Sequence, residues 1–228
     1  MNFTDQWISF IHQLQDDICN ALENADGDAK FIEDAWERAE GGGGKTRVIS
    51  NGQLIEKGGV NSSVVYGKVT GPMQSQLKIE GDSWFACGLS LVLHPLNPFV
   101  PTVHCNYRMF ELYNAENLLI DRWFGGGTDL TPYYLFEEDA KHFHQTCKTA
   151  CDKHNPEFYT KFKKQCDEYF WNAQRDEARE ERAHSTDEAA HEDGLHHVFV
   201  MQRREQRLDH RSSSLSARCS TTFSRPSR

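Results

Sequence analysis

The stretch Pro101-Thr-Val-His104-Cys-Asn106-Tyr-Arg108-Met-Phe110 alternates polar and apolar side chains along most of its length. Successive side chains of a β-strand point to opposite faces, so this alternation predicts a strand with His104, Asn106 and Arg108 on one face. Burying polar groups without hydrogen-bond partners costs free energy, so these three side chains are not expected in an apolar core. They predict instead the lining of a polar cleft.

More strands are expected on either side of this one. The preceding run Ser90-Leu-Val-Leu-His94 has the same period and adds Ser90 and His94 as a second polar set. Asn51-Gly52 predicts a two-residue hairpin turn. Hairpin-length connections predict an antiparallel sheet built from strands near 47–49, 53–56, 61–66, 75–80, 85–93, 103–112 and 118–124.

Helical spacing appears before and after the strands. Apolar residues from Trp7 to Leu22 predict an amphipathic helix that ends at Gly27, and two further helices are predicted over 137–175. The predicted fold class is therefore α/β, with a large, mostly antiparallel sheet flanked by helices.

The composition argues against a nucleic-acid-binding, a membrane-spanning or a secreted protein. The 228 residues carry a formal net charge of −9, which argues against a nucleic-acid partner. No stretch approaches the roughly 18 apolar residues of a membrane span, and the first residues lack the layout of a secretion signal. Seven cysteines without a Cys-x-x-Cys pair predict reduced thiols in a cytoplasmic protein.

Residues 1–179 and 180–228 differ in composition. The second segment contains eight Arg, no Lys and only Phe199 and Phe223 as aromatic residues. Such a composition predicts a disordered tail, because little apolar surface is available to offset chain entropy. A weakly patterned amphipathic helix over 196–208 is the alternative.

Several stretches in order resemble the oxygen-dependent coproporphyrinogen III oxidases of haem biosynthesis. The resemblance runs from about residue 10 to Arg179, and its stretches include Gly41-Gly-Gly-Gly-Lys-Thr-Arg47, Ser90-Leu-Val-Leu-His94-Pro, Pro101-Thr-Val-His104-Cys-Asn106-Tyr-Arg108 and Trp123-Phe-Gly-Gly-Gly-Thr-Asp129. It implies oxidative decarboxylation of two propionates of coproporphyrinogen III to vinyl groups, giving protoporphyrinogen IX. It also implies O₂ as co-substrate, no organic cofactor and a homodimer.

The chain departs from the family at its C-terminal side. Gln174 stands near a position where the family has a histidine, and the resemblance stops after Arg179. The C-terminal part of the family is therefore expected to be missing, with 180–228 as a non-homologous tail. A catalytically inactive copy that at most binds a tetrapyrrole is the alternative function.

The resemblance and the residue chemistry suggest the same site. Imidazole titrates near neutral pH, which suits proton transfer. The resemblance implies that His104 is the proton donor. The alternative role for His104 is that of a buried histidine bonded to a carbonyl. The planar guanidinium group of Arg108 can bind a substrate carboxylate through two hydrogen bonds. The alternative role for Arg108 is an internal ion pair with an acid such as Asp129. Arg47 and Arg122 are expected to be surface or ion-pair residues.

The expected site comprises His104 and Asp129 as catalytic residues, and Ser90, Asn106, Tyr107 through its backbone, and Arg108 as substrate-binding residues.

A metal site is the remaining alternative. His94, His104 and His144 would have to converge on one divalent ion, and their spacing lacks the short pattern of a structural site. A metal-dependent hydrolase rests on these histidines alone and is the least favoured hypothesis.

Overall fold

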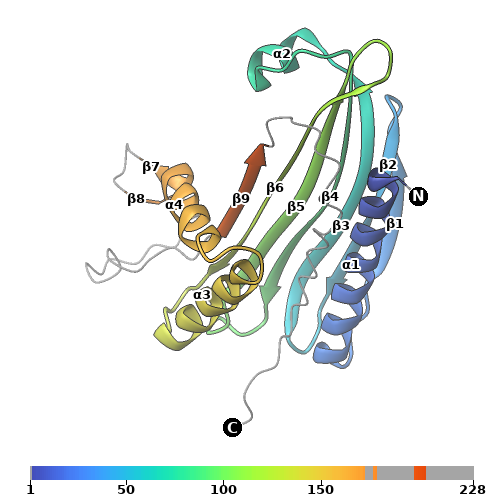
Figure 1. The fold of residues 1–228 in the computed structure, drawn as a ribbon. Coiled ribbons are helices and arrows are strands. Elements are labelled where there is room, and N and C mark those ends of the chain that lie inside the picture. The colour runs from blue at the N-terminus through green and yellow to red at the C-terminus, as the bar shows by residue number, and fades with distance from the viewer. Residues whose placement is uncertain (1, 173–176, 179–197, 204–228) are drawn as a thin grey trace.

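A seven-stranded antiparallel sheet forms the centre of the protein in a computed structural model, which describes residues 2–172, 177–178 and 198–203 (Figure 1). The strand order is β1-β2-β3-β4-β5-β6-β9. The elements are α1 (Phe3–Asp26), β1 (Ile32–Glu37), β2 (Gly42–Ser50), β3 (Ile55–Lys68), α2 (Gly71–Leu77), β4 (Ser83–Pro95), β5 (Thr102–Tyr113), β6 (Leu119–Thr131), α3 (Glu137–Asp152), α4 (Phe158–Phe170), β7 (Trp171–Asn172), β8 (Glu177–Ala178) and β9 (Val198–Arg203). The expected α/β fold with a largely antiparallel sheet is confirmed.

Helix α1 covers one face of the sheet. The Asn2 side chain accepts a hydrogen bond from the Asp5 amide at 2.8 Å, and Gly27 ends the helix in the left-handed conformation. The buried side of α1 packs on alternate residues of β3, β4 and β5, and the resulting core includes Ile11, Leu14, Cys19, Val60, Cys87, Leu89, Leu91, Leu93 and Cys105. This packing fixes which side chains of each strand point away from α1.

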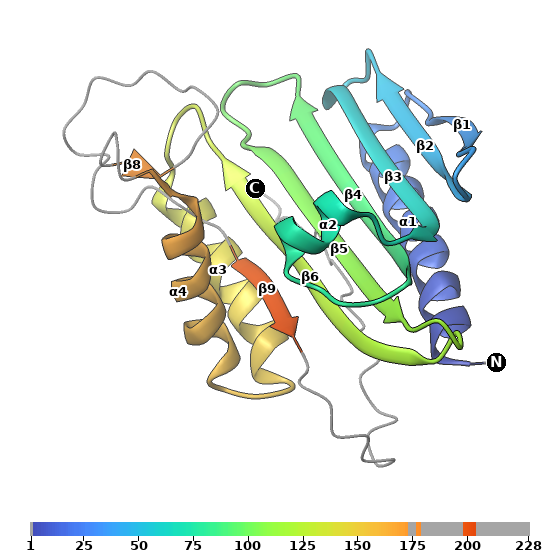
Figure 2. The same cartoon turned by 90° about the horizontal axis from the view of Figure 1, so that it is seen from above.

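Helices α2, α3 and α4 do not cover the centre of the opposite face of the sheet. Helix α2 lies on the side of the sheet away from α1, and none of its residues is buried (Figure 2). Helices α3 and α4 lie together beside the β6–β9 edge (Figures 1 and 2). In the part of the chain that the structure describes, no helix is long and apolar enough to cross a membrane.

Some local predictions are wrong, and one strand was not predicted. The strand expected at 75–80 is not formed: residues 75–77 belong to helix α2, in which Pro72 stands in the first turn and favours a helical start. Strand β1 was not predicted, because its largely exposed residues give no apolar alternation. The turn at Asn51-Gly52 is longer than two residues, since β2 ends at Ser50 and β3 begins at Ile55.

Most of 180–228 lies outside the described residues, as does Gln174. Within that segment Val198–Arg203 is strand β9, paired antiparallel with β6 from Trp123↔Arg203 to Thr128↔Val198. These six residues form neither the expected disordered tail nor the alternative helix. Val-Phe-Val is a favourable strand sequence, and β6 offers an unpaired edge for it.

Candidate functional site

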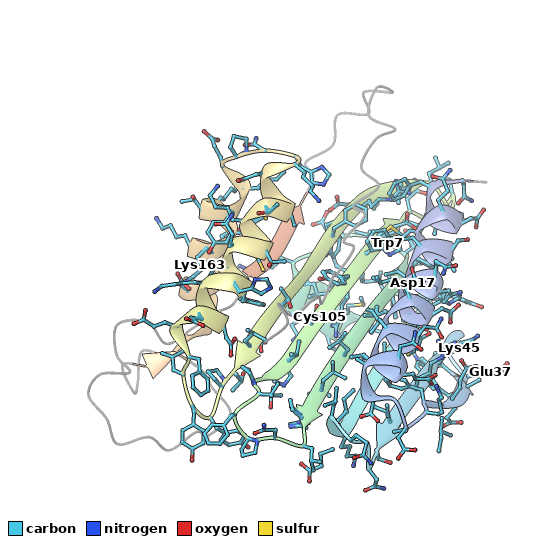
Figure 3. All side chains as sticks on the ribbon, turned by 90° about the horizontal axis from the view of Figure 1, so that it is seen from below. Trp7, Asp17, Glu37, Lys45, Cys105 and Lys163 are labelled. Carbon is cyan, nitrogen blue, oxygen red and sulfur yellow. The ribbon has the colours of Figure 1, made fainter. Side chains whose placement is uncertain are left out.

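Strand β5 divides its side chains between the two faces of the sheet as the sequence predicted. Cys105 and Tyr107 belong to the core around α1, on the face seen in Figure 3, where Cys105 and Trp7 are labelled. His104, Asn106 and Arg108 alternate with them and therefore point to the opposite face. We call this opposite face of β3, β4, β5 and β6 the site face.

The strand register adds residues from the neighbouring strands. Ser90 on β4 pairs with Asn106, and Gly127 on β6 pairs with Asn106 from the other side. Directly paired residues point to the same face, so Ser90 and Asn106 lie side by side. The ring of Tyr107 packs in the α1 core, so only its main chain borders the site face.

Glycines surround Arg108 on the site face. It is paired with Gly88 on one side and with Gly125 on the other. A Cβ atom at Gly88 would lie 2.4 Å from the Tyr107 carbonyl oxygen and 2.8 Å from Cγ of Arg108. Glycine is therefore required where the Arg108 side chain leaves the sheet, and the surface beside it has no side chains of its own.

His104 and Asp129 form the closest polar pair of the site face. They are directly paired across β5 and β6, and Nδ1 of His104 lies 2.8 Å from Oδ1 of Asp129. The His104 side chain is 37% exposed and that of Asp129 19%. An ionised carboxylate only accepts hydrogen bonds, so beside an ionised Asp129 the Nδ1 atom of His104 carries the proton.

Arg108 is exposed and makes no ion pair with any described residue. The alternative ion pair with Asp129 is not formed, because that carboxylate is bonded to His104. Arg47 and Arg122 are ion-pair residues as expected. Arg47 bonds Asp16 and Glu33, and Arg122 bonds the buried Glu111. Arg108 thus differs from both in keeping its full bidentate capacity for an anionic ligand.

An aromatic stack lies next to Arg108 on the site face and was not predicted. Phe110 on β5 stacks on Trp123 of β6 at 4.1 Å between ring centroids, and on Trp84 of β4 at 5.9 Å. The Arg38 guanidinium lies 5.8 Å from the Trp84 ring. The sequence shows these rings on different strands, but their stacking depends on the register of three strands, which the sequence does not display.

The three histidines of the metal alternative do not converge. His104 is bonded to Asp129, whereas His144 on α3 shares a 2.8 Å hydrogen bond with the Tyr159 hydroxyl of α4. His94 is exposed at the end of β4. Among the residues that the structure describes, no three His, Cys, Asp or Glu side chains gather in a way that would hold a metal ion. Within those residues, His94, His104 and His144 therefore supply no shared set of donors for one ion.

Comparison with known proteins gives a consistent result. A sequence model of the family described as Coproporphyrinogen III oxidase matches residues 6–182. An oxygen-dependent coproporphyrinogen-III oxidase of Prochlorococcus marinus is 50% identical over 173 residues, which are 75% of this chain and 49% of that protein. The protein of the same name from Parasynechococcus marenigrum is 51% identical over 168 residues, 73% of this chain and 45% of its own.

A relative from a plant is equally similar. The protein named oxygen-dependent coproporphyrinogen-III oxidase, chloroplastic, from Glycine max is 51% identical over 179 residues, 74% of this chain and 46% of its own. The chain therefore spans about half the length of the curated relatives that it matches.

Proposed function

Because the chain belongs to the coproporphyrinogen III oxidase family, we propose that it binds coproporphyrinogen III and oxidises two of its propionate side chains to vinyl groups, giving protoporphyrinogen IX. One observation carries this proposal. The bonded pair of His104 and Asp129 shares the site face with Arg108, which has no ion-pair partner among the described residues.

The substrate is large, apolar in its rings and anionic at its rim, so its binding site needs both apolar surface and a fixed cation. Arg108 supplies the cation and can hold a propionate by two parallel hydrogen bonds. The stack of Trp84, Phe110 and Trp123 supplies apolar surface one row further along the strands. The glycines beside Arg108 leave the surface flat enough for a ring to approach the strands.

The reaction removes carbon dioxide and a hydride equivalent from each propionate, and O₂ accepts the hydride equivalent. We propose that His104 donates the proton that this transfer requires, through Nε2, and that Asp129 orients the ring by holding Nδ1. Ser90 and Asn106 would bind the substrate beside them. We propose that the reaction uses no organic cofactor and no metal ion, since His94, His104 and His144 form no cluster of ligands in the described part of the chain.

The test compares two site variants with anaerobically prepared coproporphyrinogen. His104→Ala should lower turnover by about 100-fold or more with little change in affinity, because it removes the proton donor and leaves the anion contact. Arg108→Ala should instead weaken substrate binding by about 10- to 100-fold. O₂ uptake and vinyl-product formation measure the first effect, and fluorescence titration measures the second.

A matched cation outside the site provides the control. Lys141 is an exposed residue of α3 that pairs with Glu137, and Lys141→Ala should leave both quantities unchanged. Binding without any turnover would favour the alternative of a copy that only holds a tetrapyrrole. Equal and negligible effects of both site variants would refute the proposed site.

We also propose a homodimer, as the resemblance implied. In support, large apolar side chains are exposed at the end of the sheet where the β4–β5 loop meets the segment after β6. There Phe99 lies 4.9 Å from Tyr134 and 6.2 Å from Phe136 between ring centroids. Monomers rarely expose apolar patches of this kind over a large area. A molar mass of one chain by light scattering would exclude the dimer.

The proposed location remains the cytoplasm. The six cysteines in the described residues have free thiols, in keeping with a reducing compartment. The relative from Glycine max is named chloroplastic, so fluorescence imaging of the tagged chain in its own cells would decide between the two.

A further inference from the structure

Asn61 on β3 extends the polar row of the site face by one strand. It pairs directly with Ser90 of β4, which in turn pairs with Asn106 of β5. All three side chains therefore point to the face away from α1. Val60 and Ser62, the neighbours of Asn61 along the strand, point the other way and are buried under α1.

The side-chain oxygen of Asn61 has no hydrogen-bond partner within residues 2–172, 177–178 and 198–203. Among the described residues, Asn61 Oδ1 and Gln165 Oε1 are the two buried side-chain oxygen or nitrogen atoms in this condition. Gln165 is on α4, far along the chain from the site strands, whereas Asn61 lies within the polar row. An unpaired buried acceptor costs stability, and the large majority of buried polar groups in native proteins have a partner, so this exception calls for an explanation.

The neighbouring polar groups do not supply the missing donor. Asn61 Oδ1 accepts no hydrogen bond from Ser90 or Asn106 in the part of the chain that the structure describes. Asp129, the carboxylate of the site face, accepts from the Thr131 hydroxyl at 3.4 Å and, when ionised, has no proton to donate. Arg108 carries donors, but none of them is bonded to Asn61 Oδ1 in the structure. Asn61 Oδ1 is thus an acceptor on this face that is left without a donor.

We propose that Asn61 binds the tetrapyrrole by accepting a hydrogen bond from a pyrrole N–H, turning its amide toward the ligand as it enters. This inference rests on the proposed function. Each pyrrole ring of the substrate carries an N–H donor at the centre of the macrocycle, while the carboxylates lie at the rim. With about 4.8 Å between strands and 3.4 Å between residues, the Cα atoms of Asn61 and Arg108 lie about 12 Å apart. A macrocycle with a propionate arm spans that separation, so both residues can contact one ligand.

The effect of substituting Asn61 on the melting temperature distinguishes a ligand-binding role of this residue from a structural one. Asn61→Leu removes an acceptor that has no partner, so the melting temperature should stay the same or rise. The affinity for coproporphyrinogen, measured anaerobically by fluorescence titration of the full chain, should fall by about 5- to 10-fold. A lower melting temperature with unchanged affinity would show a structural asparagine and overturn the proposal.

Two further variants test whether a loss of affinity comes from the missing acceptor of Asn61. Asn61→Ala leaves space where leucine adds bulk, and it should weaken binding as much as Asn61→Leu. If only the leucine variant binds poorly, steric blocking explains the loss and the proposal is overturned. Asn114→Ala is the matched control, because Asn114 Oδ1 accepts a bond from the Leu118 amide at 2.8 Å in the β5–β6 turn. It should lower the melting temperature and leave the affinity unchanged.

The wild-type chain distinguishes failure of this inference from failure of the proposed function. If the wild-type chain does not bind coproporphyrinogen, the proposed function fails and the role of Asn61 fails with it. If the wild-type chain binds and both Asn61 variants bind equally well, the function stands and only the role of Asn61 is refuted.

Discussion

At the scale of single residues, the chemistry of the site depends on which partner each side chain has. Alternation along β5 was enough to predict that His104, Asn106 and Arg108 share a face. The pairing of His104 with Asp129 was not predicted, although both residues were expected in the site. It engages Nδ1 of the imidazole, and Arg108 forms no ion pair with a carboxylate of the described residues.

The first prediction at this scale concerns the charge of Asp129. Asp129→Asn keeps the size of the side chain and an oxygen that can accept from Nδ1, but it removes the negative charge that stabilises protonated His104. Turnover should fall by about 100-fold, with substrate affinity within about threefold of the wild type. Single-turnover oxidation under limited O₂ measures the first quantity, and anaerobic titration the second.

Thr131 supplies the control for Asp129. Its hydroxyl lies 3.4 Å from Asp129 Oδ1, a long contact that contributes little. Thr131→Val should therefore leave turnover near the wild-type rate. Full turnover in the Asp129→Asn variant would show that the carboxylate does not assist His104.

At the scale of elements, Asp26 joins the end of α1 to the turn between β2 and β3. Its carboxylate accepts hydrogen bonds from the backbone amides of Ala29, Gln53, Leu54 and Ile55 at 2.9–3.1 Å. A Cβ atom at Gly52 would lie 2.2 Å from the same carboxylate. The turn therefore closes around a side chain from another element, which is why a two-residue turn predicted from Asn51-Gly52 alone was wrong.

This turn gives a prediction about pH. Burial by itself would raise the pKa of Asp26, but the hydrogen bonds from the backbone amides of Leu54, Ala29, Ile55 and Gln53 outweigh it and hold the pKa well below its usual range. In the unfolded chain the pKa is about 3.9. The stabilisation is therefore fully present above about pH 5 and is lost as the pH falls through 4 toward the folded-state pKa.

Asp26→Asn should remove this pH-dependent part and lower the free energy of unfolding by about 2 kcal/mol at neutral pH. Urea unfolding between pH 3 and pH 7 measures both effects. The control is Asp17→Asn, since Asp17 is exposed and accepts a hydrogen bond from Gln13 within α1. Identical pH profiles for wild type and Asp26→Asn would contradict the assigned role.

At the scale of the whole molecule, a buried carboxylate connects α1 to two strands of the sheet. Glu111 on β5 is fully buried and accepts bonds from Thr4 at 2.9 Å, Tyr113 at 2.6 Å and Arg122 at 2.6 Å. The Arg122 guanidinium also lies 4.5 Å from the Phe3 ring. Burial and the neighbouring Glu111 raise the pKa of Tyr113 to about 12, so the phenol stays protonated and donates to the carboxylate.

Glu111→Gln should lower the free energy of unfolding by about 3 kcal/mol, because it leaves Arg122 partly buried without its counter-ion. Chemical denaturation with tryptophan fluorescence measures the loss. Glu137→Gln is the matched control, since Glu137 pairs with Lys141 on the exposed surface of α3 and should show no measurable change. Equal stability of both variants would mean that the buried cluster contributes nothing to holding α1 on the sheet.

The sequence by itself determined the elements with a strong period. It determined the amphipathic helix α1, the two helices after the sheet, and the faces of β4 and β5, because side-chain direction within one element follows from residue spacing. It did not reveal β1 or α2, whose residues are mostly exposed and therefore carry no pattern imposed by a core.

Tertiary structure alone decided which residues face one another across strands. Tyr113 pairs with Leu119, but Leu112 pairs with Asp121, so Ile120 has no partner of its own and the register shifts by one. Without that irregularity His104 would be opposite Thr128, and Asp129 would point toward α1. A shift of one residue reverses every side chain of a strand, and spacing within a single strand carries no information about it. The His104–Asp129 pair, the aromatic stack and the position of Asn61 beside Ser90 all depend on that pairing between strands.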